Sequence, residues 1–260
     1  TVTNDRGLTL LGRLIDSLHQ RRLGFFVAEL LLVIAGVLIA LQLDQWKETR
    51  AENVHEFEFL KKVRTDIETD VVDLTDNVKM LAAVTSFGYT AMEALEGRPC
   101  IDQCWSELVA IFQASQWIDV ELNQTSYEDI KRTGLPRDMA LRNELVTYYN
   151  VSDQARKISA DLPRFRELIR SSIPARTQEY MWGECFSVQG RKQSLNGDCA
   201  PPPNADQSLE VITRLRANPE IRTSLTYWLS TVSILKNMLH EQVSEAETVI
   251  DDLSSFLASR

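Results

Sequence analysis

Four cysteines are the residues whose type and spacing bear most directly on chemistry: Cys100, Cys104, Cys185 and Cys199. An even number of cysteines in a domain outside the cytoplasm is typical of disulfides, and four cysteines allow three connectivities. A zinc site is the alternative. Its ligands usually come in closely spaced pairs, whereas thirteen residues separate Cys185 from Cys199 and no histidine lies near them. We predict two disulfides and favour the local pairs, Cys100–Cys104 and Cys185–Cys199, because glycines and prolines that break helices flank them.

The histidines do not form a site along the sequence. His19, His55 and His240 are far apart, and His19 is predicted to lie on the opposite side of a membrane from the other two. The sequence contains no HExxH, CxxCH, Walker loop, GxSxG or GxGxxG motif, which would supply metal ligands, haem attachment, phosphate contacts or an activated serine. We therefore predict that the protein is not an enzyme and binds no metal or cofactor.

Carboxylates and tryptophans are abundant, but their spacing has simple structural interpretations. Asp66, Glu68 and Asp70 lie among apolar residues at helical spacing, so we interpret them as the solvent-exposed face of a helix. The pair Asp251–Asp252 has the same interpretation. Tryptophans can stack on a ligand, but we interpret one of them as an anchor at the membrane interface and the others as side chains that pack between helices. The five are Trp46, Trp105, Trp117, Trp182 and Trp228.

The net charge is −9, but residues 1–43 hold four bases and three acids, so residues 44–260 carry a net charge of −10. An acidic domain of this kind is repelled by nucleic acid and by anionic lipid, so we predict no nucleic-acid partner. The composition, with 44% hydrophobic and 25% charged residues, is typical of one ordinary folded domain. It excludes a disordered chain and a multi-span transporter.

Residues 24–43 are predicted to form a transmembrane helix. They are twenty residues with one ionisable group, Glu29, and a helix of that length covers about 30 Å, the thickness of a hydrocarbon core. A cleaved signal peptide is the alternative, but its apolar region is shorter and ends in small residues at a cleavage site. We predict that Glu29 and the following Trp46 contact a partner in the membrane. Glu29 reaching the interface is the simpler alternative.

The flanking bases favour a cytoplasmic N-terminus, because Arg13, Arg21 and Arg22 precede the span. Residues 1–23 are then a cytoplasmic tail, and residues 44–260 are a periplasmic domain at a bacterial inner membrane. Within the tail, apolar residues fall on one helical face, which predicts an amphipathic helix that lies on the membrane or against a partner protein. These residues are Leu8, Leu11, Leu14, Ile15 and Leu18.

Two long apolar patterns dominate the predicted periplasmic domain. Steps of three and four run from Leu60 to Leu81, and a five-heptad run goes from Ile221 to Phe256, where only Gln242 fills an apolar place. We expect these two helices to pack against each other in antiparallel fashion. The predicted fold is all-α: one N-terminal transmembrane helix, then an exported helical bundle with two long antiparallel helices.

Shorter helices are predicted between the two long ones. Gly88 and Gly97 are candidate ends of the first long helix, and a short helix follows Cys104. Thr125 and Ser126 are predicted to cap a short helix that ends at Gly134. Further helices are expected at residues 138–161, 163–173 and 174–182. Residues 183–207 have no periodicity and two cysteines, so we predict a disulfide-tied loop, and such loops often bind partners.

Two segments resemble a family of bacterial single-span membrane proteins known only as a domain of unknown function. The first is Ala28-Glu29-Leu30 and the apolar run to Gln42, followed by Trp46. The second is the segment 125–134, similar to S-x-Y-E-x-[IL]-K-x-[ST]-G, with the segment 141–150, similar to L-R-x-x-[IL]-x-x-Y-Y-N. The resemblance covers residues 24–150, whereas the cysteine-bearing loop departs from it. It implies a short cytoplasmic tail, one span and a helical ectodomain, and it implies no activity or ligand.

These features favour a non-catalytic accessory subunit that docks on and stabilises a larger integral-membrane complex. Respiratory, photosynthetic and transport complexes are all candidates, and the predicted partners are their membrane subunits and the lipid bilayer. The alternative is a periplasmic ligand-sensing module that signals through a separate protein, since the short tail carries no output domain. Self-association through the heptad seam, giving a homo-oligomer, is also open.

Overall fold

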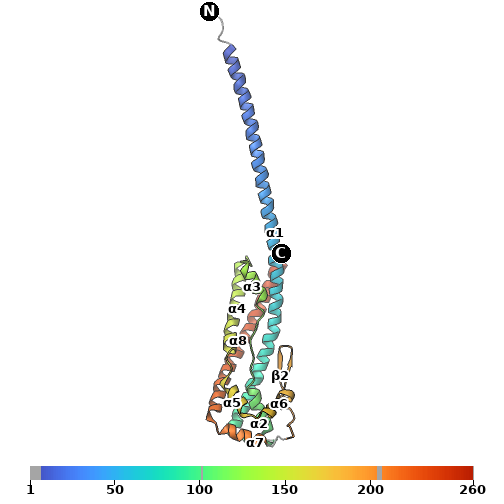
Figure 1. The fold of residues 1–260 in the computed structure, drawn as a ribbon, viewed down its shortest axis with the longest axis vertical. Coiled ribbons are helices and arrows are strands. Elements are labelled where there is room, and N and C mark those ends of the chain that lie inside the picture. The colour runs from blue at the N-terminus through green and yellow to red at the C-terminus, as the bar shows by residue number, and fades with distance from the viewer. Residues whose placement is uncertain (1–6, 101, 204–206, 260) are drawn as a thin grey trace, which may run out of the picture. The chain divides into compact units, whose positions relative to one another are not determined.

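The structure is a computed structural model that describes residues 7–100, 102–203 and 207–259, with side chains from residue 28 onward except that of Asp102 (Figure 1). It is mostly helical and divides into two compact units, residues 1–57 and 58–260, which are considered separately below. Helix α1 (Gly7–Leu95) contributes to both units. The remaining elements belong to the second unit.

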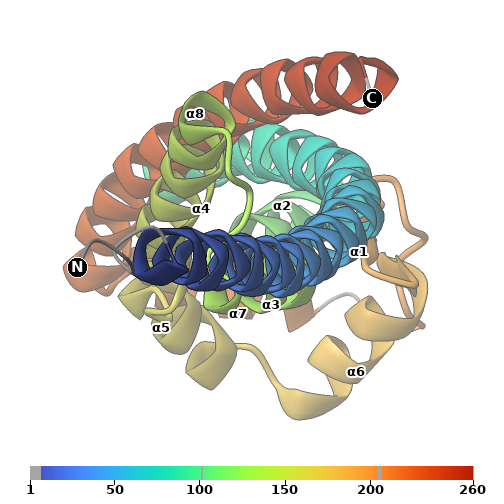
Figure 2. The ribbon, with the colours of Figure 1, turned by 90° about the horizontal axis from the view of Figure 1, so that it is seen from above.

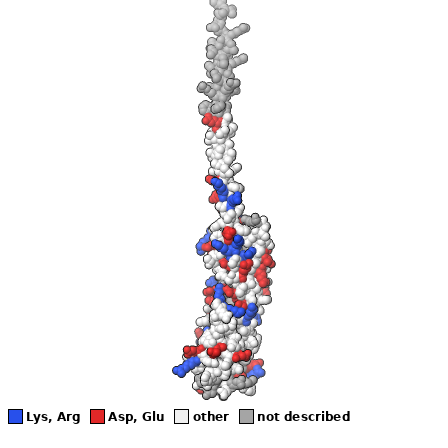
Figure 3. Space-filling model, turned by 90° about the vertical axis from the view of Figure 1, so that its right-hand side faces the viewer, with Lys and Arg blue, Asp and Glu red and all other residues white. Residues whose placement is uncertain are grey.

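The first unit consists of the N-terminal part of α1. Its apolar stretch is long and apolar enough to cross a membrane, and none of it is buried within the molecule. Figure 3 shows this stretch as a white band without charged residues. The predicted amphipathic segment Leu8–Leu18 lies within α1, but its side chains lie outside the described residues.

In the second unit, α1 buries the predicted apolar stripe. Leu60, Val63 and Ile67 are fully buried, and so is Leu81. Gly88 does not end the helix. A β-carbon at Gly88 would lie 2.3 Å from Leu229 Cδ2, so this glycine allows a close approach to the side chain of another helix. The chain leaves the helix beyond Leu95, where Gly97 adopts a φ of 101°, a conformation that favours glycine.

Helix α8 (Pro219–Ala258) begins at a proline. Pro219 occupies its first turn, and the side chain of Asn218 accepts a hydrogen bond from the backbone N–H of Glu220 at 3.0 Å. Its heptad positions are buried from Ile221 to Leu253, including Gln242. The pattern in the sequence therefore located both the helix and its buried face.

Helices α1 and α8 share two hydrophobic clusters, and the order of the residues shows that they run antiparallel. Leu60 packs in one cluster with Leu253, and Leu81 packs in the other with Leu235. The backbone of α8 lies closer, however, to α4 (Met139–Ser159), which runs alongside it in Figures 1 and 2. The predicted antiparallel relation is confirmed. Helices α4 and α5 (Arg164–Ser172) also pack along α8.

The shorter helices surround this core. Asp138 caps α4 by accepting hydrogen bonds from the backbone N–H groups of Ala140 and Leu141. The predicted cap at Thr125–Ser126 is wrong, since both residues lie inside the helix and Gln124 precedes it without a side-chain cap. Helix α7 was not predicted from the sequence. The elements are η1 (Asp102–Cys104), α2 (Trp105–Ala114), α3 (Thr125–Arg132), α5 (Arg164–Ser172), α6 (Ala175–Glu184) and α7 (Ser208–Arg216).

A β-hairpin corrects the all-α prediction. Strands β1 (Phe186–Gln189) and β2 (Lys192–Leu195) pair antiparallel within the segment predicted to be a loop. Four-residue strands are too short to show alternation in a sequence, and the turn is made by Gly190, whose φ is 62°. Arg191 holds the turn to α1 through an ion pair with Asp73 at 3.1 Å.

Candidate functional site

The four cysteines form the two local disulfides that the sequence analysis favoured. The Cα atoms of Cys100 and Cys104 are 4.7 Å apart, and those of Cys185 and Cys199 are 5.2 Å apart. The second disulfide closes the segment that contains the hairpin. The indole N–H of Trp105 donates to the carbonyl of Cys199 at 2.9 Å, which fixes this segment to α2. These cysteines are therefore structural, and none is free.

The two residues predicted to contact a partner in the membrane are both exposed in the first unit. Glu29 lies at the start of the described apolar side chains, and 59% of the Trp46 side chain is exposed. The guanidinium of Arg50 lies over the Trp46 ring at 5.5 Å from its centroid. An indole beside a cation, next to an apolar stretch, is the arrangement typical of a membrane interface.

A buried polar cluster joins three helices of the second unit. We define the Asp70 cluster as Asp70, Asn123, Tyr148 and Gln242. Asp70 Oδ1 accepts hydrogen bonds from the Asn123 backbone N–H at 3.0 Å and from its side-chain Nδ2 at 2.8 Å. The Tyr148 hydroxyl donates to Asp70 Oδ2 at 3.2 Å, and the Gln242 side chain donates to the Tyr148 carbonyl at 3.0 Å. The cluster links α1, α4 and α8 through polar contacts within an otherwise apolar core.

The charge of Asp70 is disfavoured by its position. Asp70 is fully buried, and burial raises its pKa from 3.8 to about 6, although its hydrogen bonds from Asn123 and Tyr148 act in the opposite direction. The nearby Asp66 adds a smaller upward effect. Burial and the negative charge of Asp70 also raise the pKa of Tyr148, which therefore stays protonated and donates its hydroxyl hydrogen.

The interpretation of Asp70 as solvent-exposed is wrong. Asp70 lies three residues after Ile67 and four before Leu74, so it occupies an apolar-stripe position exactly as Gln242 does in the other long helix. The spacing alone could have predicted this burial. A polar residue that takes an apolar position is buried when the residues three before it and four after it are buried. Glu68 and the pair Asp251–Asp252 are exposed, as predicted.

A second buried charge lies at the other end of the second unit. The guanidinium of Arg170 lies over the ring of Phe112 at 3.6 Å and over that of Trp182 at 4.7 Å. Its three nitrogens are buried and have no hydrogen-bond partner among the described residues. Burial, with a smaller effect of Arg166, lowers the pKa of Arg170 to about 9, so it remains charged at neutral pH. Contact with two aromatic faces replaces part of its lost hydration.

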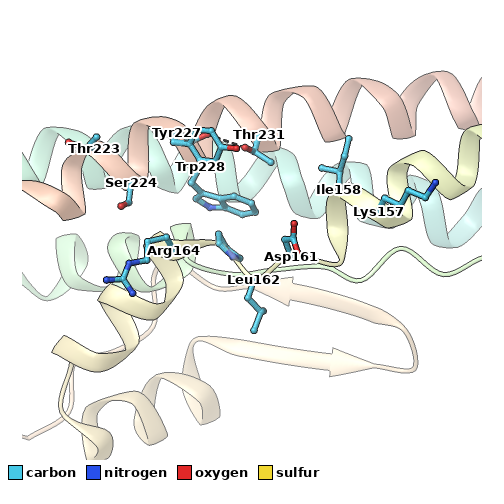
Figure 4. A pocket seen from close by; sticks show the side chains of 11 residues that line it. Lys157, Ile158, Asp161, Leu162, Arg164, Thr223, Ser224, Tyr227, Trp228 and Thr231 are labelled. Carbon is cyan, nitrogen blue, oxygen red and sulfur yellow. Dashed lines mark hydrogen bonds between the residues drawn. The ribbon is translucent and has the colours of Figure 1, made fainter.

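A cavity of about 730 Å³ opens between α8 and the segment that joins α4 to α5 (Figure 4). We call it the α8 cavity. Trp228 forms its buried floor, and 77% of the Tyr227 side chain and 63% of the Leu162 side chain are exposed at its rim. Lys157, Asp161 and Arg164 supply its charges. Its volume is in the range of small-molecule sites, which is about 300–1,000 Å³.

Within the part of the chain that the structure describes, no three His, Cys, Asp or Glu side chains gather as a metal would require. Comparisons with protein-family models, with curated proteins and with solved structures found no match. What the fold defines is a mostly helical protein with two disulfides and one helix that is long and apolar enough to span a membrane. The family resemblance of residues 24–150 stays a prediction.

Proposed function

We propose that the protein is a non-catalytic accessory subunit that docks on and stabilises a larger integral-membrane complex. The exposed apolar stretch of α1 carries this proposal. Every described side chain from 28 to 43 is exposed, and the large apolar ones range from 45% exposed at Ile34 to 75% at Leu32. An exposed apolar surface of this size is unfavourable in water. A lipid bilayer and neighbouring membrane helices are the surroundings that it fits.

The compartment of the second unit is proposed from the disulfides and the flanking charges. Two disulfides persist in an oxidising compartment, which favours the periplasm for residues 44–260. Arg13, Arg21 and Arg22 favour the cytoplasm for the other end of the span. An acidic periplasmic surface would not hold the protein on an anionic membrane, so the helix serves as the anchor.

Glu29 is the proposed polar contact within the membrane. A carboxylate near the bilayer centre costs about 3 kcal/mol on insertion scales, and a polar or basic group on a neighbouring helix would offset this cost. Trp46 and Arg50 would fix the depth of the helix at the interface. We thus propose that the transmembrane helix makes the main docking contacts and that the periplasmic unit adds to them.

Photo-crosslinking from the span tests this proposal. A photoreactive amino acid is placed at Leu30, Leu31, Leu32 and Val33 in turn, in membranes of the source bacterium. Because residues three and four apart share a helix face, the positions nearest Glu29 on the surface are Leu32 and Val33. We expect these two to crosslink to another membrane protein and Leu30 and Leu31 to crosslink more weakly. Products with lipid alone, or a product of two copies of this chain, would contradict docking on another complex.

A second candidate function is ligand sensing by the periplasmic unit, and the α8 cavity is the observation that favours it. A ligand held between α8 and the α4–α5 segment would contact two helices that pack along α8. A change in how these helices pack on α8 can pass a signal along that long helix. A separate signalling protein would have to receive it.

A further inference from the structure

The α8 cavity has a rigid aromatic floor. Only 2% of the Trp228 side chain is exposed, its indole N–H donates to the Ala114 carbonyl at 2.8 Å, and its ring packs on Trp117 with centroids 5.3 Å apart. Since the N–H is already used, the indole offers only ring surface to the cavity. The Tyr227 ring and the Leu162 side chain stand at the rim and are largely exposed. An occupant would therefore gain apolar and ring contacts on more than one side.

The charges around the cavity are not equivalent. Arg164 is already paired, because its Nε lies 3.0 Å from Glu220 Oε1 and its Nη1 lies 2.8 Å from Glu167 Oε2. Asp161 is exposed, and among the described residues it forms no ion pair or hydrogen bond of the kind that Arg164 forms with Glu167 and Glu220. Figure 4 shows the Asp161 carboxylate on the side facing Trp228, whereas the Lys157 ammonium points away from the indole. The charge that remains available beside the aromatic floor is therefore negative.

Four hydroxyl groups complete the lining, those of Thr223, Ser224, Tyr227 and Thr231, and two of them already donate within α8. The Thr223 and Thr231 hydroxyls donate to carbonyls of their own helix, at 3.2 Å to Pro219 and at 3.2 Å to Tyr227. They present lone pairs to the cavity, and lone pairs accept hydrogen bonds from an ammonium. These acceptors, one carboxylate and two aromatic rings together suit a cation and disfavour an anion.

We propose that the α8 cavity binds an organic cation, an amine with an apolar or aromatic body. The ammonium group pairs with the Asp161 carboxylate and lies against the rings of Trp228 and Tyr227. The apolar body lies against Leu162 and Ile158. An anion of the same shape meets the charge of Asp161 and finds Arg164 already paired. This site is independent of docking through the span, and it would supply the ligand in the sensing alternative.

Calorimetric titration of the full chain in nanodiscs of zwitterionic lipid tests the proposal. The probes are phenethylammonium and 3-phenylpropionate, which share an aromatic body and a two-carbon linker and differ in charge. We expect the ammonium probe to bind one site per chain, at least about tenfold more tightly than the propionate. Equal affinities, tighter binding of the propionate, or the same heat with empty nanodiscs would overturn the proposal.

Matched variants locate the site. Asp161→Asn removes the charge and should weaken phenethylammonium binding about fivefold, in the range of a partly exposed ion pair. Tyr227→Ala removes an exposed ring at the rim and should also weaken it. Asp251→Asn removes an exposed carboxylate elsewhere on α8 and should leave the affinity unchanged. Thermal unfolding of each variant verifies folding. Folded Asp161→Asn protein with unaltered affinity would contradict the assignment of the carboxylate.

Discussion

At the scale of single residues, the second unit holds two buried charges, and the protein accommodates them in different ways. Asp70 keeps its hydrogen-bond partners but loses hydration, so burial raises its pKa to about 6. Arg170 loses both hydration and hydrogen-bond partners among the described residues, and the rings of Phe112 and Trp182 cover its faces. Near neutral pH both groups are charged inside the protein. Each therefore lowers the stability that an uncharged residue of similar shape would give.

Asp70→Asn should stabilise the protein and change its pH dependence. Because the folded-state pKa lies above the unfolded value of 3.8, the folded state binds more protons between about pH 4 and pH 6. The free energy of unfolding should therefore fall as the pH rises through this window, and the loss should be complete above it. The asparagine Oδ1 still accepts both hydrogen bonds from Asn123, and its Nδ2 donates to the Tyr148 hydroxyl oxygen, so the hydrogen bond with Tyr148 reverses direction and the charge is removed.

Urea unfolding at pH 7.5 and at pH 4.5 measures the effect. We expect Asp70→Asn to raise the free energy of unfolding at pH 7.5 by roughly 1–3 kcal/mol, and to do so less at pH 4.5. Asp70→Ala should destabilise at both pH values, because it leaves the Asn123 and Tyr148 donors unsatisfied. The control is Asp251→Asn, an exposed carboxylate. A gain for Asp70→Asn that is the same at both pH values would refute the pKa assignment.

At the scale of elements, helical periodicity predicted most of the fold. Both long helices, and the glycine and proline positions that separate the shorter ones, follow from sequence spacing. The hairpin was missed because a four-residue strand leaves too few repeats to define a period. Helix α7 was missed although Val211, Ile212 and Leu215 have helical spacing and are buried. The α8 cavity could not be predicted either. Trp228 belongs to the heptad seam, and only the fold brings Asp161 and Leu162 next to it.

The two disulfides should differ in their contribution to stability. Cys185–Cys199 closes a segment with a sequence separation of 14, and Cys100–Cys104 one with a separation of 4. In the chain-entropy model, removing the longer closure costs about 3 kcal/mol and removing the shorter one about 2 kcal/mol. We expect the double variant Cys185→Ala, Cys199→Ala to melt below Cys100→Ala, Cys104→Ala. Calorimetry measures the melting temperatures of both variants. The reverse order of melting temperatures would show that packing in the folded state outweighs loop length.

Gly88 and Leu229 should behave as a coupled pair between α1 and α8. Alanine gains about 1 kcal/mol over glycine within a helix, but a β-carbon at Gly88 would lie too close to Leu229 Cδ2. We expect Gly88→Ala to stabilise the protein clearly in a Leu229→Ala background and to stabilise it less, or to destabilise it, in the wild-type background. A double-mutant cycle from urea unfolding measures the coupling. The same change in both backgrounds would show that the close approach is not maintained in solution.

At the scale of the whole molecule, the protein combines an exposed apolar helix with a disulfide-bonded helical unit. The apolar stretch was predicted to be a transmembrane helix from its length, because a run of twenty residues with one ionisable group is typical of such a helix. Composition also predicted the acidic second unit. Neither property identifies the complex on which the protein is proposed to dock, because an apolar helix surface carries little information about what packs on it.

Labelling of engineered cysteines in intact spheroplasts tests the topology most directly. Tyr227→Cys introduces an exposed thiol in the second unit, and Ser17→Cys introduces one before the span. We expect a membrane-impermeant maleimide to label Tyr227→Cys at once and to label Ser17→Cys only after the membrane is permeabilised. We also expect the chain to stay in the membrane fraction after alkaline carbonate extraction. The reverse labelling, or release of the chain by carbonate, would contradict a membrane-anchored periplasmic domain.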